Sequence, residues 1–447
     1  MRTPISDFLL EYSASGISRL HMPGHKGNAF TGAEPKDITE IKGADVLHSA
    51  EGIIAESEGI ATELFGTGKT VYSTEGSTLA IRTMLFLVAR NSGEKPLVIA
   101  GRNAHKSFLY SAALLDFDIK WLFPEGDYSS LATMSITPGA VERAVISSDR
   151  KPSAVYLTSP DYMGNILDVE GIARALAPYG IPLLVDNAHG AYLHFLDEPR
   201  HPMDLGAFMC SDSAHKTLPV LTGGAYLHMS KEAAELYGDE VKRAMSVFAS
   251  TSPSYVILDS LDLCNNYISS GYREKLNSSV KRLNEIRTFA KNKGIKLIDG
   301  EPLKLVIDAS AIGYSGDTLA QIMREHLVEP EYSDPDYLVL MAGTENSERD
   351  YERIAAALSK VTPKAEKPKL SLESLRSVKS KMSVREAIFA KSERLRVDKA
   401  AVGRTVSTPT VSCPPAIPIV SAGEVLTDEV LPIFEKYGIY EIDLVKE

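Results

Sequence analysis

The chain has 447 residues, of which 44% are hydrophobic and 24% are charged. This composition is typical of a globular protein with a large core and one or two smaller domains, and it argues against a small binding module. Lys and Arg number 48 against 59 Asp and Glu, so the formal net charge is -11. Because a phosphate backbone demands a cationic surface, we expect no nucleic-acid partner.

The three cysteines, Cys210, Cys264 and Cys413, are far apart and form no CxxC pair. This spacing indicates neither a disulfide framework nor a structural zinc site, so we predict no metal and a reducing, cytoplasmic location. No uncharged apolar run approaches the roughly 18 to 20 residues that span a bilayer. Residues 1–16 lack the continuous apolar segment of a secretory signal, so we expect neither export nor a membrane partner.

Residues 62–228 alternate short apolar runs with segments of helical length, a pattern typical of βα units and a mainly parallel, buried sheet. The candidate strands are residues 97–100, 154–159, 183–185 and 224–228. Polar clusters lie beside the ends of these runs, where open α/β sheets place their ligands. The sequence therefore predicts an α/β fold with its site along one edge of the sheet.

From residue 254 the pattern becomes helical, and a charged stretch at 273–293 is expected to lead to a smaller domain. Two further strand candidates, at 303–310 and 337–343, flank a helical stretch and predict a small α/β domain. Residues 361–383 are rich in Lys, Ser and Pro, which favours an exposed connector. The prolines after residue 413 favour extended structure before a helical segment at 429–438.

Lys216, in the segment SDSAHKTLP, is the first candidate for chemistry. A lysine becomes a covalent catalyst when its surroundings lower its pKa and hold it against an aldehyde. Most lysines are simply solvated. Here Ser213 and His215 can donate hydrogen bonds to a phosphate, and Gly223 and Gly224 allow a backbone to pass close to a cofactor.

Asp186 follows the apolar run PLLV, where a carboxylate is costly to desolvate without a cationic partner. The protonated pyridine nitrogen of pyridoxal 5'-phosphate (PLP) is such a partner, and the ion pair lets the ring accept electrons from a developing carbanion. A simple role in capping the next turn is the alternative.

The segment YSTEGSTLAIRTM predicts a polar loop that leads into an amphipathic helix. Gly76, Ser77 and Thr78 are the candidate phosphate ligands, because a helix N-terminus offers N–H groups and hydroxyls to an anion. Ser and Thr before a helix are often only caps, so this motif depends on the others.

Three histidines stand beside these motifs. His105 follows a predicted strand and can lie on one face of the pyridine ring as a proton route, although a lone histidine is more often structural. His189 can orient Asp186 or contact the cofactor. His25, with Lys26 in HMPGHKG, can contact phosphate or fix a loop, and the sequence favours neither.

Taken in order, these segments resemble the fold type I ornithine/lysine/arginine decarboxylases. The resemblance covers most of the chain and rests on HMPGHKG (21–27), DITEIKGADVLH (37–48), the loop at 72–80, RNAHKS (102–107), TSPDYMGNILD (158–168), VDNAHGAY (185–192), SAHKTLP (213–219) and PPAIPIVSAGE (414–424). It implies a PLP cofactor. It also implies a large PLP-binding domain with an N-terminal segment at 1–275, a small α/β domain at 276–365, and a linker with a decarboxylase-type C-terminal domain at 366–447.

The resemblance assigns roles to individual residues. Lys216 corresponds to the lysine that binds PLP covalently, Asp186 to the partner of the pyridine nitrogen, and His105 to the histidine stacked on the ring. The positions around the cofactor phosphate and pocket are Gly76, Ser77, Ser213, His215, Ala188 and His189. The family also implies a homodimer or larger homo-oligomer, and the chain resembles its short form, without an N-terminal regulatory domain.

Some positions depart from the family pattern. The pocket motif often has an acidic residue where Asn187 stands and a histidine where Tyr192 stands, and Ala214 replaces a common threonine. Glu424 keeps the glutamate of a C-terminal turn, and it is our candidate for contact with a cationic substrate side chain.

We therefore expect PLP-dependent α-decarboxylation of arginine, lysine or ornithine to a polyamine-pathway amine and CO2. An aminotransferase or lyase on the same fold is the main alternative, since lysine, aspartate and phosphate loop are common to all of them. A catalytically silent PLP-binding homologue is the other. No motif discloses the shape of the pocket that would select one basic side chain.

Overall fold

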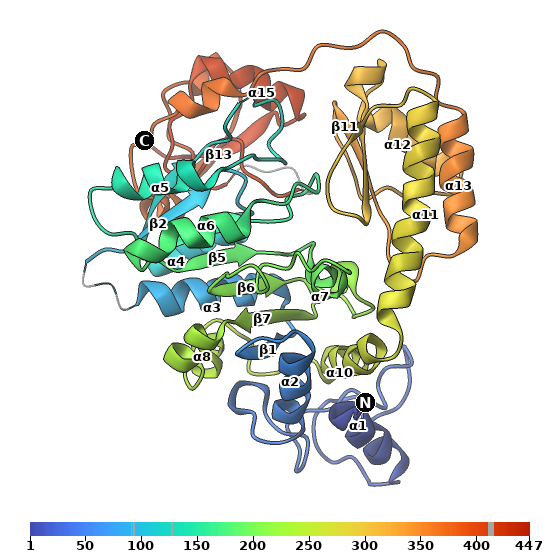
Figure 1. Ribbon diagram of the computed structural model, residues 1–447. Helices are drawn as coiled ribbons and strands as arrows, with labels where there is room; N and C mark the ends of the chain where they lie inside the picture. Colours follow the sequence, from blue (N-terminus) through green and yellow to red (C-terminus); the bar gives the residue numbers. More distant parts are fainter. Residues whose placement is uncertain (91, 93, 127, 410–414) are drawn as a thin grey trace. The chain divides into compact units, whose positions relative to one another are not determined.

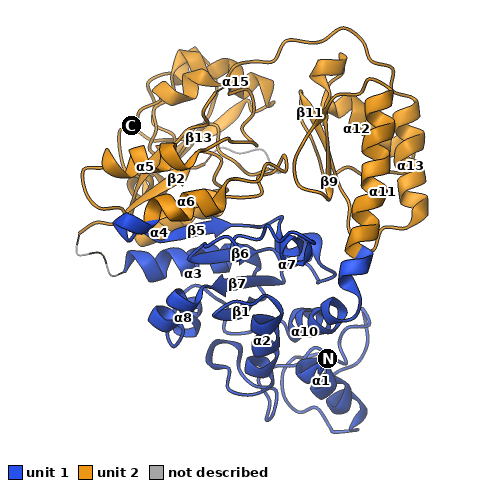
Figure 2. Ribbon diagram, viewed as in Figure 1, with its two compact units in different colours: residues 1–91, 177–275 blue, residues 92–176, 276–447 orange. Residues whose placement is uncertain are grey.

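The computed structural model describes residues 1–90, 92, 94–126, 128–409 and 415–447, so Cys413 and Pro414 lie outside the described residues. The chain forms two compact units, which Figure 2 colours separately. The first unit contains residues 1–91 and 177–275, and the second contains residues 92–176 and 276–447. The predicted division into three domains stays a prediction. In the described part of the chain, no helix has both the length and the apolar character needed to cross a bilayer.

Four strands of the large sheet belong to the first unit, in the order β1-β7-β6-β5. They are β1 (Lys69–Ser73), β5 (Leu183–Asp186), β6 (Met209–Asp212) and β7 (Ala225–Met229). β5 and β6 are parallel, whereas β7 runs antiparallel to β6 and β1. Every residue of β5, β6 and β7 is buried, as expected for strands whose two faces are both covered.

The helices of the first unit (Figure 1) are α1 (Pro4–Ala14), α2 (Ile53–Leu64), α3 (Gly76–Ala89), α7 (Ala214–Thr217), α8 (Lys231–Tyr237), α9 (Val241–Ser246) and α10 (Tyr255–Ser269). Most of α3 is apolar and buried, since it packs against β1, β6 and β7. α10 begins where Ser254 accepts the N–H of Ile257, a common helix N-cap.

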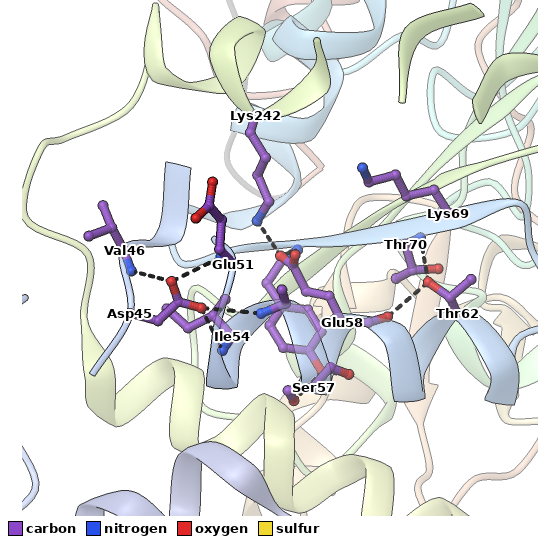
Figure 3. Close-up of polar contacts among 12 residues, drawn as sticks. Asp45, Val46, Glu51, Ile54, Ser57, Glu58, Thr62, Lys69, Thr70 and Lys242 are labelled. Carbon is purple, nitrogen blue, oxygen red and sulfur yellow. Dashed lines mark hydrogen bonds and ion pairs between the residues drawn. The ribbon is translucent and has the colours of Figure 1, made fainter. Parts of the chain in front are cut away.

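Two carboxylates fix α2 in the first unit (Figure 3). Asp45 accepts backbone N–H groups of Gly52 and Ile54 at 2.8 and 3.0 Å, at the start of the helix. Within the helix, the buried Glu58 forms an ion pair with Lys242 of α9 and accepts the N–H of Tyr72 in β1 at 2.8 Å. Burial raises the pKa of Glu58, and Lys242 opposes this effect. The pair therefore joins α2, α9 and β1.

The second unit contributes three parallel strands to the large sheet, in the order β4-β2-β3, and two smaller antiparallel sheets, β10-β11-β9-β8 and β12-β13. The strands are β2 (Leu97–Gly101), β3 (Asp118–Leu122), β4 (Ala154–Thr158), β8 (Leu297–Ile298), β9 (Lys304–Asp308), β10 (Tyr332–Ser333), β11 (Tyr337–Met341), β12 (Ser392–Arg396) and β13 (Glu441–Val445).

The helices of the second unit are α4 (Lys106–Leu115), α5 (Pro138–Ile146), α6 (Val169–Leu176), α11 (Tyr272–Asn292, which starts in the first unit), α12 (Gly316–Glu325), α13 (Glu348–Ser359), α14 (Val384–Phe389) and α15 (Leu431–Lys436). The 3-10 helices of the two units are Leu47–Ser49, Ala177–Tyr179, Ala191–Phe195, Ser310–Ile312, Glu373–Ser377, Lys399–Ala401 and Asp428–Val430. One hydrophobic core of this unit packs α11, α12 and α13 against β9 and β11. A second gathers buried residues of the C-terminal segment, including Phe434 and Leu444.

The predicted α/β class with a large, mostly parallel sheet is confirmed. The four predicted strands correspond to β2, β4, β5 and β7, and the pair expected in the small α/β domain to β9 and β11. Our predictions did not include β1, β3 and β6 of the large sheet, or β8, β10, β12 and β13 of the two smaller sheets. β3 is mostly half-exposed, and β6 ends in the polar residues Ser211 and Asp212, so neither has a long apolar run.

Candidate cofactor-binding and active site

The parallel strands β5 and β6 end side by side in the first unit. Asp186, the last residue of β5, is in register with Ser211, and the N–H of Asn187 donates to the Ser211 carbonyl at 2.9 Å. Asp186 is buried, with 3% of its surface exposed. The short helix α7, which carries Lys216, begins two residues after the end of β6. Strand topology thus brings the two strand ends that carry Asp186 and Lys216 to one edge of the sheet.

Lys216 lies close to the histidine of the pocket motif. Its Nζ is 3.1 Å from Nε2 of His189, which is buried. His189 follows Asp186 by three residues, with the small side chain of Ala188 between them. Lys216 and His189, which we selected from two different sequence motifs, are therefore in contact in the structure.

The predicted phosphate loop lies at the N-terminus of α3. Gly76 begins this 14-residue helix, and a Cβ added there would meet no atom within 4 Å, so the space at this end is open. The hydroxyl of Ser213 donates to the hydroxyl of Ser77 at 2.9 Å. Thr78 follows Ser77 in the same first turn. Two hydroxyls and the N–H groups of a helix N-terminus form a donor set suited to a phosphate.

Gly223 closes the back of this loop. Its carbonyl accepts the N–H of Gly76 at 2.7 Å, and its φ of 101° favours glycine. A Cβ at Gly223 would lie 3.0 Å from the Thr74 carbonyl oxygen. The glycine therefore lets the loop approach the segment after α7. We expected Gly223 to let the backbone pass close to a cofactor. In the structure, its backbone passes close to Thr74 of the predicted phosphate loop.

His215 bonds to the same segment. Its Nδ1 lies 3.0 Å from the Gly224 carbonyl, to which the ring donates. Burial lowers the pKa of His215, and the charge of Lys216 adds to this effect. The neutral ring then carries its proton on Nδ1, so Nε2 donates to a phosphate only when the ring is protonated.

The remaining two predicted site residues belong to the second unit. His105 caps α4, since its Nδ1 accepts the N–H of Ser107 at 3.2 Å, and its neutral ring therefore carries a proton on Nε2. Glu424 is buried and ion-paired, with Oε2 3.1 Å from Nη2 of Arg102. The same carboxylate accepts the N–H of Ser421 at 2.6 Å. The roles of His105 on the cofactor ring and of Glu424 on substrate stay predictions.

The early HMPGHKG motif folds onto itself. His25 Nε2 is 3.1 Å from Asp37, its Nδ1 accepts the N–H of Gly27 at 3.0 Å, and Lys26 donates to the His21 carbonyl. Of the two roles that the sequence left open, these contacts support the fixing of a loop.

One buried polar group escaped the sequence reasoning. Asp212 ends β6 as Asp186 ends β5, and its carboxylate contacts His201, His228 and Asn187. The sequence signal was weak, because in MCSD a serine separates the two apolar residues from the carboxylate, whereas in LLVD three apolar residues precede it.

The donor set of the first unit fits PLP. It offers a lysine amine, a buried carboxylate at a strand end and hydroxyls at a helix N-terminus, which suit an aldehyde, a pyridine nitrogen and a phosphate. Lys216, Asp186, Ser77 and Ser213 are the principal members.

Comparison with known proteins agrees with this chemistry. The family model "Orn/Lys/Arg decarboxylase, major domain" matches residues 3–304. The arginine decarboxylase of Bacillus subtilis (strain 168) is 28% identical over 458 residues, which cover 96% of this chain and 92% of that protein. The arginine decarboxylase of Halalkalibacterium halodurans is also 28% identical and covers 96% of this chain and 91% of its own length. Among solved structures, the Francisella novicida lysine decarboxylase LdcF has a TM-score of 0.80 at 17% identity, covering 99% of this chain and 81% of that one.

Proposed function

Because the chain belongs to the Orn/Lys/Arg decarboxylase family, we propose that it removes the α-carboxylate of arginine as CO2 and releases the corresponding amine. The fold is that of fold type I PLP enzymes, and the chain is a PLP-dependent decarboxylase of a basic amino acid. Arginine is favoured over lysine and ornithine by the proteins named arginine decarboxylase that match nearly the whole chain. The observation that carries the proposal is the placing of Asp186 and the Lys216 helix at adjacent strand ends.

We assign the cofactor contacts as follows. Lys216 would hold PLP covalently, and Asp186 would pair with its pyridine nitrogen. The phosphate would lie at the N-terminus of α3, with Gly76, Ser77, Thr78, Ser213 and His215 around it. Ala188 and His189 would line the pocket, and His105 would lie on the ring. When bound, PLP supplies an electron sink for the bond that breaks at Cα.

The protein selects which bond breaks. The residues around Lys216 would orient the substrate so that the bond from Cα to the carboxylate is the one that the bound cofactor activates. Asp186 would keep the pyridine nitrogen of bound PLP protonated and so support the electron sink that the cofactor supplies. The Lys216 amine, 3.1 Å from His189, is the group we assign to return a proton to Cα.

We also propose that the protein acts as a homodimer, with the N-terminal segment around residues 20–30 in the interface. The large apolar side chains of Leu20 and Phe30 in this segment are 93% and 83% exposed, and a homodimer contact would cover them. Light scattering at low and high protein concentration tests the dimer.

The buried free thiols of Cys210 and Cys264 suit a reducing compartment such as the cytoplasm. The amine product would serve polyamine synthesis.

Release of CO2 tests the reaction. Purified protein with added PLP is given arginine, lysine or ornithine, beside the variants Lys216→Ala and Lys231→Ala. Lys231 is an exposed lysine at the start of α8 and serves as a matched control. We expect release from arginine that is lost in Lys216→Ala and kept in Lys231→Ala. Release only from lysine or ornithine would overturn the choice of arginine, and release from none would overturn the substrate class.

A further inference from the structure

Asp212 is a buried carboxylate that the chemistry above does not use. His201, Asp212 and His228 are all fully buried. Oδ2 of Asp212 lies 2.9 Å from His201 Nε2 and 3.2 Å from His228 Nε2. Oδ1 accepts the side-chain amide of Asn187 at 2.7 Å and the thiol of Cys210 at 3.3 Å. Burial raises the pKa of Asp212, but the two histidines together hold it well below its usual range.

The ligand atoms of His201, Cys210 and Asp212 lie within 4.8 Å of one another, as they would around a metal ion. The contacts of His201 argue against that use. Its Nδ1 accepts the N–H of Met203 at 3.3 Å, so the neutral ring carries its proton on Nε2, the atom that faces Asp212. A protonated nitrogen cannot bind a metal, and the group is therefore a hydrogen-bond network.

The network joins the two strand ends of the site. Asn187 directly follows Asp186, and Asp212 precedes Lys216 by four residues on the adjacent parallel strand and its continuation. The Asn187 side chain therefore connects the two strand ends through a hydrogen bond. It also accounts for the departure noted in the pocket motif, because an acidic residue at position 187 would face the Asp212 carboxylate in a buried site.

We propose that Asp212 is a positioning residue that holds Asp186 at a fixed place relative to Lys216, through the hydrogen bond from Asn187. The inference rests on the roles proposed above for Asp186 and Lys216. It does not depend on which amino acid is the substrate.

Exchange of the acid and the amide tests the inference. In Asn187→Asp two buried carboxylates face each other, and in Asp212→Asn two amides do. In the double variant, the amide at position 212 can donate to the carboxylate at 187 while its oxygen accepts from His201 and His228. The hydrogen bonds with residue 187 and with the two histidines are then restored with the acid and amide exchanged, and only the weak contact from the Cys210 thiol is lost.

The readout is the dissociation constant of PLP, followed by the absorbance of the bound cofactor without substrate. We expect each single variant to weaken PLP binding about ten-fold or more, and the double variant to recover about ten-fold over the sum of the two losses. A double variant no better than that sum, or an Asp212→Asn protein with unchanged PLP affinity, would overturn the inference.

Two further variants separate positioning from general stability. Asn187→Ala removes only the donor, and we expect weaker PLP binding with a nearly unchanged unfolding temperature of the PLP-free protein. Thr70→Val removes the contact that Thr70 Oγ1 makes with His228 Nδ1 at 2.8 Å, on the far side of the ring from Asp212. It should lower the unfolding temperature and leave PLP affinity unchanged. If Asn187→Ala behaves like Thr70→Val, the network is merely structural. A cofactor absorbance that does not depend on Lys216 would instead contradict the proposed function.

Discussion

Buried charges at strand ends have different surroundings in the two units. In the first unit, Asp212 accepts hydrogen bonds from side chains, and one of these belongs to the residue after Asp186. In the second unit, Arg102 and Asp161 also follow strands within family-like motifs, but they bond mainly to loop backbone. Arg102 donates to the carbonyls of Pro418 and Ile419 at 3.0 and 2.8 Å, as well as to Glu424.

A residue of a family-like motif can therefore hold a loop in place without contacting a ligand. Asp161 of the TSPDYMGN motif accepts N–H groups of Met134, Met163 and Asn165. Lys304 donates to the Asp161 carbonyl at 3.0 Å and pairs with Glu301. We therefore expect changes to these second-unit charges to alter stability, and changes around Lys216 to alter cofactor binding.

The largest effect on stability is expected from Arg102→Met. The variant leaves Glu424 buried without its cation, which should lower the free energy of unfolding by about 3 to 5 kcal/mol. Denaturant unfolding measures this change. Arg143→Met is the control, because the Arg143 side chain is 69% exposed in its pair with Glu125, and about 0 to 1 kcal/mol is expected. Equal losses in both variants would contradict the importance of the buried pair.

The next effect concerns pH. Burial raises the pKa of Asp161 to about 6 from 3.8, although its N–H donors oppose this effect. The folded protein then binds this proton more tightly than the unfolded chain. Its contribution to stability is full below about pH 4 and is lost as pH rises through about 6, by about 3 kcal/mol.

Asp161→Asn should remove this share of the pH dependence. The measurement is the free energy of unfolding at several values between about pH 4 and 7, with the exposed Asp149→Asn as control. A variant with the same slope as the parent protein would show that Asp161 ionises normally in the folded state.

The smallest effect is expected from Ser77→Ala in the first unit. Loss of one hydroxyl at the N-terminus of α3 should weaken PLP binding about ten-fold, with the unfolding free energy of the PLP-free protein changed by less than about 1 kcal/mol. Equilibrium titration with PLP measures it. Ser269→Ala, an exposed serine of α10, is the control and should leave PLP affinity unchanged. A large loss of stability in Ser77→Ala would erase the contrast between the units.

Local patterns predicted much of the fold and selected candidates for the site. Asp186 became a candidate because a carboxylate after a buried apolar run needs a partner, and Lys216 because polar and glycine residues surround it. The buried strands made only of apolar residues and glycine, such as β2, were the easiest to predict, whereas β3, which is mostly half-exposed, and β6, which contains Ser211 and Asp212, were missed.

The rest depends on contacts between distant residues. Arg102 and Glu424 are 322 positions apart, so no local pattern shows that Glu424 has a cation. His201 lies outside any helix or strand, and it meets Asp212 only because of the way the chain returns to β6. The departure from the family motif at Asn187 is explained only by its hydrogen bond with Asp212, which lies on another strand.

The proposed role of Lys216 is tested most simply by locating the covalent bond to PLP. Protein loaded with PLP is reduced with borohydride and digested, and the pyridoxyl group is mapped by mass spectrometry. We expect the group on Lys216, with none on the exposed Lys231. A pyridoxyl group on any other lysine, with Lys216 unmodified, would contradict the central claim.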